Sequence, residues 1–154
     1  MKKKGMIRSK ILVQNTIRVS SVLYIILFVY AAVSKFLDFQ QFKIQLGQSP
    51  IITAYAAWIA WGIPLLELVI ATLFLFQRWM LLAFYSSFAL MTMFTTYILI
   101  MLNFSDYIPC SCGGVLEQLG WTEHIVFNGV FVAMAVIAIY FLEHQQIPNK
   151  SVES

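Results

Sequence analysis

The two cysteines of the chain stand close together, in the segment 109–114 with the sequence Pro-Cys-Ser-Cys-Gly-Gly. A disulfide between Cys110 and Cys112 needs a tight local turn, because in an extended backbone their α-carbons lie near the upper limit for such a bond, about 6.8 Å. The glycines that follow can permit that turn. A disulfide closed over so short a loop is expected to be strained, and strained, exposed disulfides exchange readily. The spacing therefore favours electron transfer by Cys110 and Cys112 over a structural crosslink.

Three other interpretations of the cysteine pair stay open. Cys110 and Cys112 could form an inert structural disulfide, remain two unpaired thiols, or bind a soft metal such as Cu(I). Two thiolates are too few for a closed zinc site unless other residues join them. We therefore predict no metal site.

His124 follows the cysteines, just before the last apolar run of the chain. At the mouth of a helix bundle it could accept a proton from a thiol, or favour the thiolate when it is charged. An ordinary histidine at the membrane interface is the alternative. Asn128 stands one helical turn beyond His124, so the two can share a helix face.

Glu67 is the only acidic residue inside a predicted membrane span, where an ionisable group should face the bundle or a cavity. Counting from Ile51 at 1.5 Å per residue puts it about 24 Å below the outer mouth, too deep to touch the cysteines. Its role is then either interhelical hydrogen bonding, or proton handling and contact with a polar head group. The candidate hydrogen-bond partners carry hydroxyl groups and are Ser21, Ser86, Ser87 and Thr92.

Lys35 closes the first apolar run, on the side where few basic residues occur. Its side chain is expected to reach the lipid head groups or to pair with an acidic residue nearby. The candidate acidic partners are Asp38, Asp106 and Glu123.

The composition predicts an integral membrane protein, because 60% of the 154 residues are hydrophobic and 11% are charged, against about 25% charged in soluble domains. Four apolar runs are long enough to cross a bilayer, and the first extends into flanks reaching from 11 to 39. They cover 19–33, 51–76, 79–102 and 125–142. We predict an all-α, polytopic bundle of four transmembrane helices over 19–142. A basic N-terminus (1–18) precedes it and a polar tail (143–154) follows.

The basic residues indicate how the spans are oriented. Most of them fall on one side, and the exceptions are Lys35 and Lys43. By the positive-inside rule both termini lie in the cytoplasm, and the 34–50 and 103–124 loops face outward. In a bacterium this means the inner membrane, with the cysteines in the periplasm. The basic N-terminus is thus a topology signal, not a nucleic-acid surface, and since further spans follow we prefer a retained first helix to a cleaved signal peptide.

Four motifs in this order resemble the MauE branch of the DoxX-like membrane proteins, over about residues 18–142. They are Ser-Lys-Phe at 34–36, Gln-Ser-Pro at 48–50, Pro-Leu-Leu-Glu-Leu at 64–68, and the cysteine motif. The region 112–124 looks like the version found in Bacteroidetes-type members. The resemblance implies redox maturation in the cell envelope, with Cys110 and Cys112 as the redox pair, a thioredoxin-like partner, and the quinone chemistry linked to DoxX members. Many MauE sequences have a bulky residue in place of Gly114, so identical activity does not follow.

The sequence thus predicts a membrane thiol–disulfide redox protein that exchanges electrons with a periplasmic thioredoxin-like or disulfide-containing client. Quinone is the candidate cofactor. The alternative is a non-catalytic membrane subunit or assembly factor of a larger envelope complex, and a third is a small transporter or metal-handling protein. Whether the chain is an enzyme stays open at this point.

Overall fold

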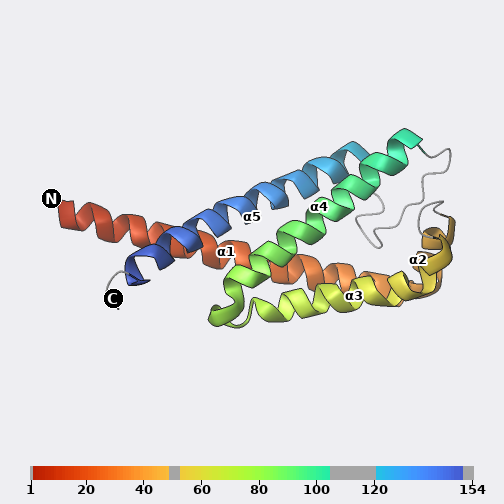
Figure 1. Cartoon of the computed structure of the whole chain (residues 1–154), viewed down its shortest axis with the longest axis horizontal. Helices are drawn as coiled ribbons and strands as arrows, with labels where there is room; N and C mark the ends of the chain where they lie inside the picture. Colours follow the sequence, from red (N-terminus) through yellow and green to blue (C-terminus); the bar gives the residue numbers. More distant parts are fainter. Residues whose placement is uncertain (1, 49–52, 105–120, 151–154) are drawn as a thin grey trace.

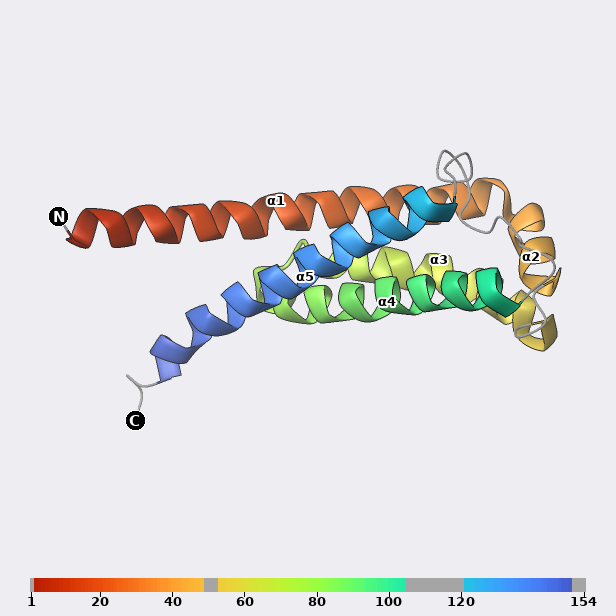
Figure 2. The ribbon, with the colours of Figure 1, turned by 90° about the horizontal axis from the view of Figure 1, so that it is seen from above.

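The computed structural model describes residues 2–48, 53–104 and 121–150, and every element in these ranges is helical. The helices are α1 (Lys2–Leu37), α2 (Phe39–Gln48), α3 (Ala56–Leu73), α4 (Met80–Phe104) and α5 (Trp121–Lys150), with short 3₁₀ turns η1 (Thr53–Tyr55) and η2 (Gln77–Trp79). The four long helices run lengthwise and α2 lies across one end, which we call the α2 end (Figures 1 and 2). At the opposite, terminal end, α1 begins and α5 ends.

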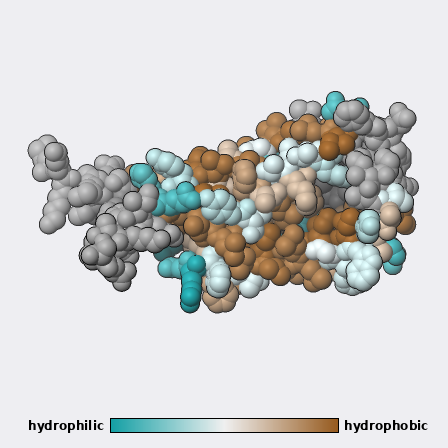
Figure 3. Space-filling model, in the orientation of Figure 1, coloured by the Kyte–Doolittle hydropathy of each residue, from teal (hydrophilic) through white to brown (hydrophobic). Residues whose placement is uncertain are grey.

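Four helices are long and apolar enough to cross a membrane, which confirms the predicted all-α fold with four spans. The apolar stretches are Ile11–Leu37, Thr53–Leu73, Gln77–Ile100 and Glu123–His144. Hydrophobic residues cover the middle of the visible face, and hydrophilic residues gather towards both ends (Figure 3). This banding matches a lipid bilayer, which satisfies no polar groups in its core.

The connection between the second and third spans is short, because only η2 and a few flanking residues separate α3 from α4. Two helices are longer than the apolar runs indicated. α1 extends back to Lys2, and α5 continues past Leu142 to Lys150. The polar residues flanking these runs are thus helical, although they lie beyond the apolar stretches.

The prediction that 34–50 is a connecting loop is wrong, because most of it forms α2. Phe42 and Leu46 are buried, whereas Lys43 and Ile44 are exposed. Spacing of three and four residues between apolar positions is typical of an amphipathic helix. The buried face of α2 packs against Ala56 and Ala60 of α3.

An aromatic cluster joins the long helices where they cross. The Tyr24 ring lies 5.3–5.8 Å, between ring centroids, from the rings of Phe28, Phe74, Phe84 and Phe131. The Tyr24 hydroxyl donates a hydrogen bond of 2.6 Å to the backbone oxygen of Phe131. Tyr24 therefore connects α1 to α5 through a polar bond and to α4 and the end of α3 through ring contacts.

Small residues let α2 approach α3 closely, and enlarging one of them should destabilise the bundle. Ala60 is 0% exposed beneath Phe42 and Leu46. Ala60→Leu is expected to cost about 1–3 kcal/mol of unfolding free energy, because the added atoms have no space. The matched control is Ala57→Leu, at an exposed position of the same helix. Equal unfolding midpoints for the two variants, measured by titration with SDS in mixed micelles, would contradict this packing.

Candidate functional site

A buried ion pair joins α1 to α3. Lys35 Nζ lies 2.8 Å from Glu67 Oε1, and the side chains are 5% and 1% exposed. Lys35 Nζ also donates to the backbone oxygen of Ala31 at 3.3 Å. The lysine side chain thus turns back along its own helix, as helical side chains tend to do, and brings its charge inside the bundle.

This pairing corrects the partners predicted for both residues. Lys35 pairs neither with Asp38 nor with Glu123, and Asp106 lies outside the described residues. Glu67 does not use the expected hydroxyls, since those of Ser21 and Ser87 donate to the backbone of their own helices.

Two features of the structure explain why Glu67 and Lys35 meet. The count began at Ile51, whereas α3 begins at Ala56. The lysine side chain, in turn, reaches back one helical turn from the end of α1. Together these two effects bring the charges to the same level of the bundle.

Two aromatic rings flank the Lys35 ammonium. Its Nζ lies 5.9 Å from the centroid of the Phe42 ring of α2 and 5.8 Å from that of the Phe94 ring of α4. A cation over an aromatic face is attracted by the negative face of the ring. Lys35 is thereby in contact with α2, α3 and α4 as well as with its own helix.

His124 brings the fifth helix to this region. It lies in the first turn of α5, is 7% exposed, and interacts electrostatically with Lys35. Asn128, one turn further along α5, is 4% exposed. His124 is therefore buried rather than exposed at the interface. We call Lys35, Glu67 and His124 the polar cluster.

Two buried polar atoms, one of them in the polar cluster, have unmet hydrogen-bonding capacity. Within the described residues, Glu67 Oε2 and the Tyr97 hydroxyl have no hydrogen-bond partner. Lipid offers no donor or acceptor, so an unsatisfied polar group in a membrane span is energetically costly. Within the described residues, the hydrogen bonding of Glu67 and Tyr97 is thus incomplete.

The cysteine segment is attached at the same end as the polar cluster. Cys110 and Cys112 lie outside the described residues, between the last residue of α4, Phe104, and the first of α5, Trp121. Both of these helix termini lie at the α2 end (Figure 1). His124 follows Trp121 within one turn. Because Cys110 and Cys112 lie outside the described residues, a contact between His124 and their thiols stays a prediction.

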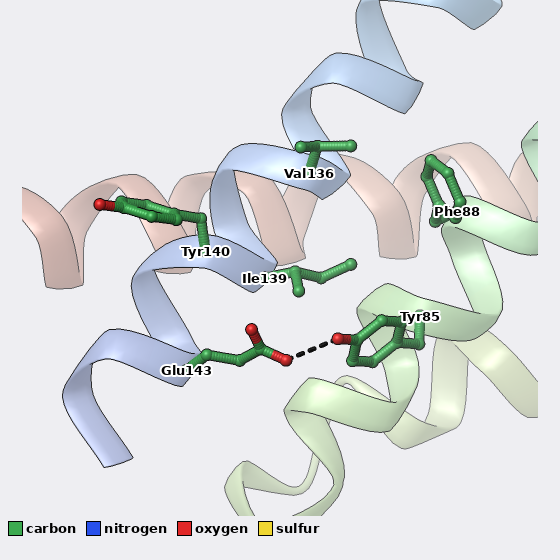
Figure 4. Close-up of a pocket in the computed structure, with 6 residues that line it drawn as sticks. All are labelled: Tyr85, Phe88, Val136, Ile139, Tyr140 and Glu143. Atoms are coloured by element: carbon green, nitrogen blue, oxygen red, sulfur yellow. Dashed lines mark hydrogen bonds between the residues drawn. The ribbon is translucent and has the colours of Figure 1, made fainter. Parts of the chain in front are cut away.

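A pocket lies on the surface between α4 and α5, away from the polar cluster (Figure 4). This pocket has a volume of about 260 Å³, and the Tyr85 hydroxyl donates a hydrogen bond of 2.6 Å to Glu143 Oε1 at its edge. The remaining lining is mostly apolar and comprises Phe88, Val136, Ile139 and Tyr140. None of the site residues predicted from the sequence lies there. Nor do three or more potential metal-ligating side chains gather anywhere in the described ranges.

Comparison with known proteins identifies the family. The family described as methylamine utilisation protein MauE matches residues 13–141. No curated protein matches the chain, and neither does any solved structure. The likeness to DoxX proteins and to Bacteroidetes-type members stays a prediction. Because the match covers all four membrane spans and most of the chain, the protein belongs to the MauE family.

Proposed function

We propose that the protein is a membrane thiol–disulfide redox protein whose Cys110 and Cys112 exchange electrons with a thioredoxin-like or disulfide-containing client. We further propose that it lies in the bacterial inner membrane with both termini in the cytoplasm, so that the cysteines face the periplasm. Membership of the MauE family supports a redox or methylamine-utilisation context.

The observation that carries this proposal is the position of the polar cluster. Buried ionisable residues are rare inside membrane spans and mark functional sites by default. Here Lys35 and His124 lie at the end of the bundle from which the cysteine segment extends. A positive charge near a thiol favours the reactive thiolate.

In the direction of client oxidation, the exchange takes place in two steps. A client thiolate attacks one sulfur of the Cys110–Cys112 disulfide, which breaks as a mixed disulfide forms. The second client thiolate then attacks the client sulfur of that mixed disulfide, so the client leaves with a disulfide. Two electrons and two protons remain on Cys110 and Cys112 as a dithiol. Since the chain has only two cysteines, these electrons cannot pass to a second internal pair.

Quinone is the cofactor that we propose as electron acceptor. The residues present fit the two forms of such a head group: Lys35 is a donor that a quinone carbonyl could accept from, and Glu67 Oε2 is an unsatisfied acceptor for the hydroxyl of the quinol product. When bound, a quinone would supply a two-electron, two-proton acceptor. The contribution of the chain would be to bind and orient it among the helices.

Replacement of Cys110 tests the proposal. Cys110→Ser is expected to reduce client oxidation in membranes to the level of membranes lacking the protein, because no disulfide can form within the chain. Exchange is measured by tagging client thiols with a mass-shifting alkylating reagent. The matched control is Ser111→Ala, between the cysteines, which should keep full activity. Unchanged client oxidation in Cys110→Ser would exclude this function.

A second candidate function is a non-catalytic subunit or assembly factor of an envelope complex. The closed Lys35–Glu67 pair favours it, since an ion pair between two helices can hold a bundle together without chemistry. This function predicts that the protein purifies with a stable partner and that replacing the cysteines changes nothing.

A further inference from the structure

The unsatisfied oxygen of Glu67 indicates a binding site that the cysteines do not form. We infer that the polar cluster binds a small molecule bearing a hydroxyl group, which donates a hydrogen bond to Glu67 Oε2. The inference deepens the proposed function where the ligand is a quinol, but the site itself does not depend on the cysteines.

Glu67 provides the acceptor. Its side chain is 1% exposed, and Oε1 is occupied by Lys35 Nζ at 2.8 Å. Oε2 is buried and no described residue donates to it. Buried carboxylate oxygens are almost always hydrogen-bonded, and within a membrane span the lipid cannot supply the donor. A molecule bound inside the bundle meets this need.

Tyr97 of α4 provides a second unsatisfied group. Its buried hydroxyl has no partner among the described residues. Tyr97 follows Phe94 by three positions on α4, so the two share a helix face, and the Phe94 ring lies 5.8 Å from Lys35 Nζ. A hydroxyl group both donates and accepts. On this inference, one bound hydroxyl donates to Glu67 and accepts from Tyr97.

A tyrosine of α4 and a glutamate of α5 provide a comparison. The Tyr85 hydroxyl donates directly to Glu143 Oε1 at 2.6 Å, with no third molecule between them (Figure 4). The Tyr24 hydroxyl is likewise satisfied, by the backbone of Phe131. The unmet groups of Glu67 and Tyr97 thus distinguish the polar cluster from these two places.

Two sources can supply the hydroxyl: a water molecule or the ring hydroxyl of a quinol. Both are tested by radiolytic hydroxyl-radical footprinting with mass spectrometry on the full chain, purified in detergent and washed free of lipid. Radicals formed from a bound water modify the nearest buried rings. Phe94 should therefore be modified several-fold more than Phe88, which is a partly buried ring of the same helix.

Substitution of the tyrosine provides the matched comparison. Tyr97→Phe removes one partner of the bound hydroxyl and should lower the modification of Phe94 towards that of Phe88. Tyr85→Phe, which removes the hydroxyl that donates to Glu143, should leave the modification of Phe94 unchanged. Cys110→Ser should also leave it unchanged, so a failure of the redox function is distinguishable from a failure of this site.

Addition of a short-chain quinol then separates the two sources. A fall in Phe94 modification, normalised to Tyr85, supports a quinol as the ligand. No fall, with Phe94 modified above Phe88, supports water. Modification of Phe94 no greater than that of Phe88 in the washed protein overturns the inference, and so does a Phe94 signal that Tyr97→Phe leaves unchanged.

Discussion

Glu67→Leu is expected to lower the free energy of unfolding by about 3–5 kcal/mol, because it leaves the Lys35 ammonium buried without its counter-charge. Lys35 is 5% exposed, so bulk solvent cannot hydrate the ammonium in place of the lost carboxylate without opening the bundle. The flanking rings of Phe42 and Phe94 offset only part of this loss, since a cation–π contact contributes about 0.5–2 kcal/mol. The change is measured by reversible unfolding with SDS in mixed micelles, followed by circular dichroism.

The double variant Lys35→Met, Glu67→Leu separates the contribution of the ion pair to the free energy of unfolding from the penalty of leaving one charge buried alone. Apolar residues of similar size in place of a buried pair are often neutral or stabilising, so most of the stability should return. The matched control is Glu143→Leu, an exposed glutamate, which is expected to cost less than about 1 kcal/mol. If Glu67→Leu costs no more than Glu143→Leu, the ion pair does not hold α1 to α3.

Tyr24→Ala is expected to cost about 3–5 kcal/mol of unfolding free energy, as large aromatic truncations in packed cores do. Tyr24 is 0% exposed, and its removal would leave a cavity where four aromatic rings now meet it. Because the cluster joins α1 to α4 and α5, the loss should also reduce the cooperativity of unfolding.

Tyr24→Phe separates the ring from the hydroxyl. It keeps the ring contacts and removes only the hydrogen bond to Phe131, so the expected cost is about 0.6 kcal/mol, typical of polar contacts between membrane helices. Tyr140→Ala, at a side chain that is 60% exposed, is the control for loss of aromatic area. Comparable costs for Tyr24→Ala and Tyr140→Ala would show that the cluster does not organise the core.

The candidate site was only partly predictable. Lys35, Glu67 and His124 each stand out in the sequence, since ionisable residues are unusual within or beside apolar runs. The contact between Lys35 and Glu67 cannot be recognised in the sequence, because the two residues are separated by 32 positions and belong to different helices. The unsatisfied hydroxyl of Tyr97 carries no sequence signal, since tyrosines are common in membrane helices. The role of Cys110 and Cys112 stays a prediction.

The four spans follow from the sequence by itself, because transfer into lipid depends on the local apolar content of each run. The tertiary structure alone decided the rest. α2 was missed because it is a short amphipathic helix whose apolar face is buried only by contact with α3. The Lys35–Glu67 pair depends on the relative depth of α1 and α3, and on the direction in which the lysine side chain turns. Hydropathy along the chain specifies neither, since both depend on packing between helices.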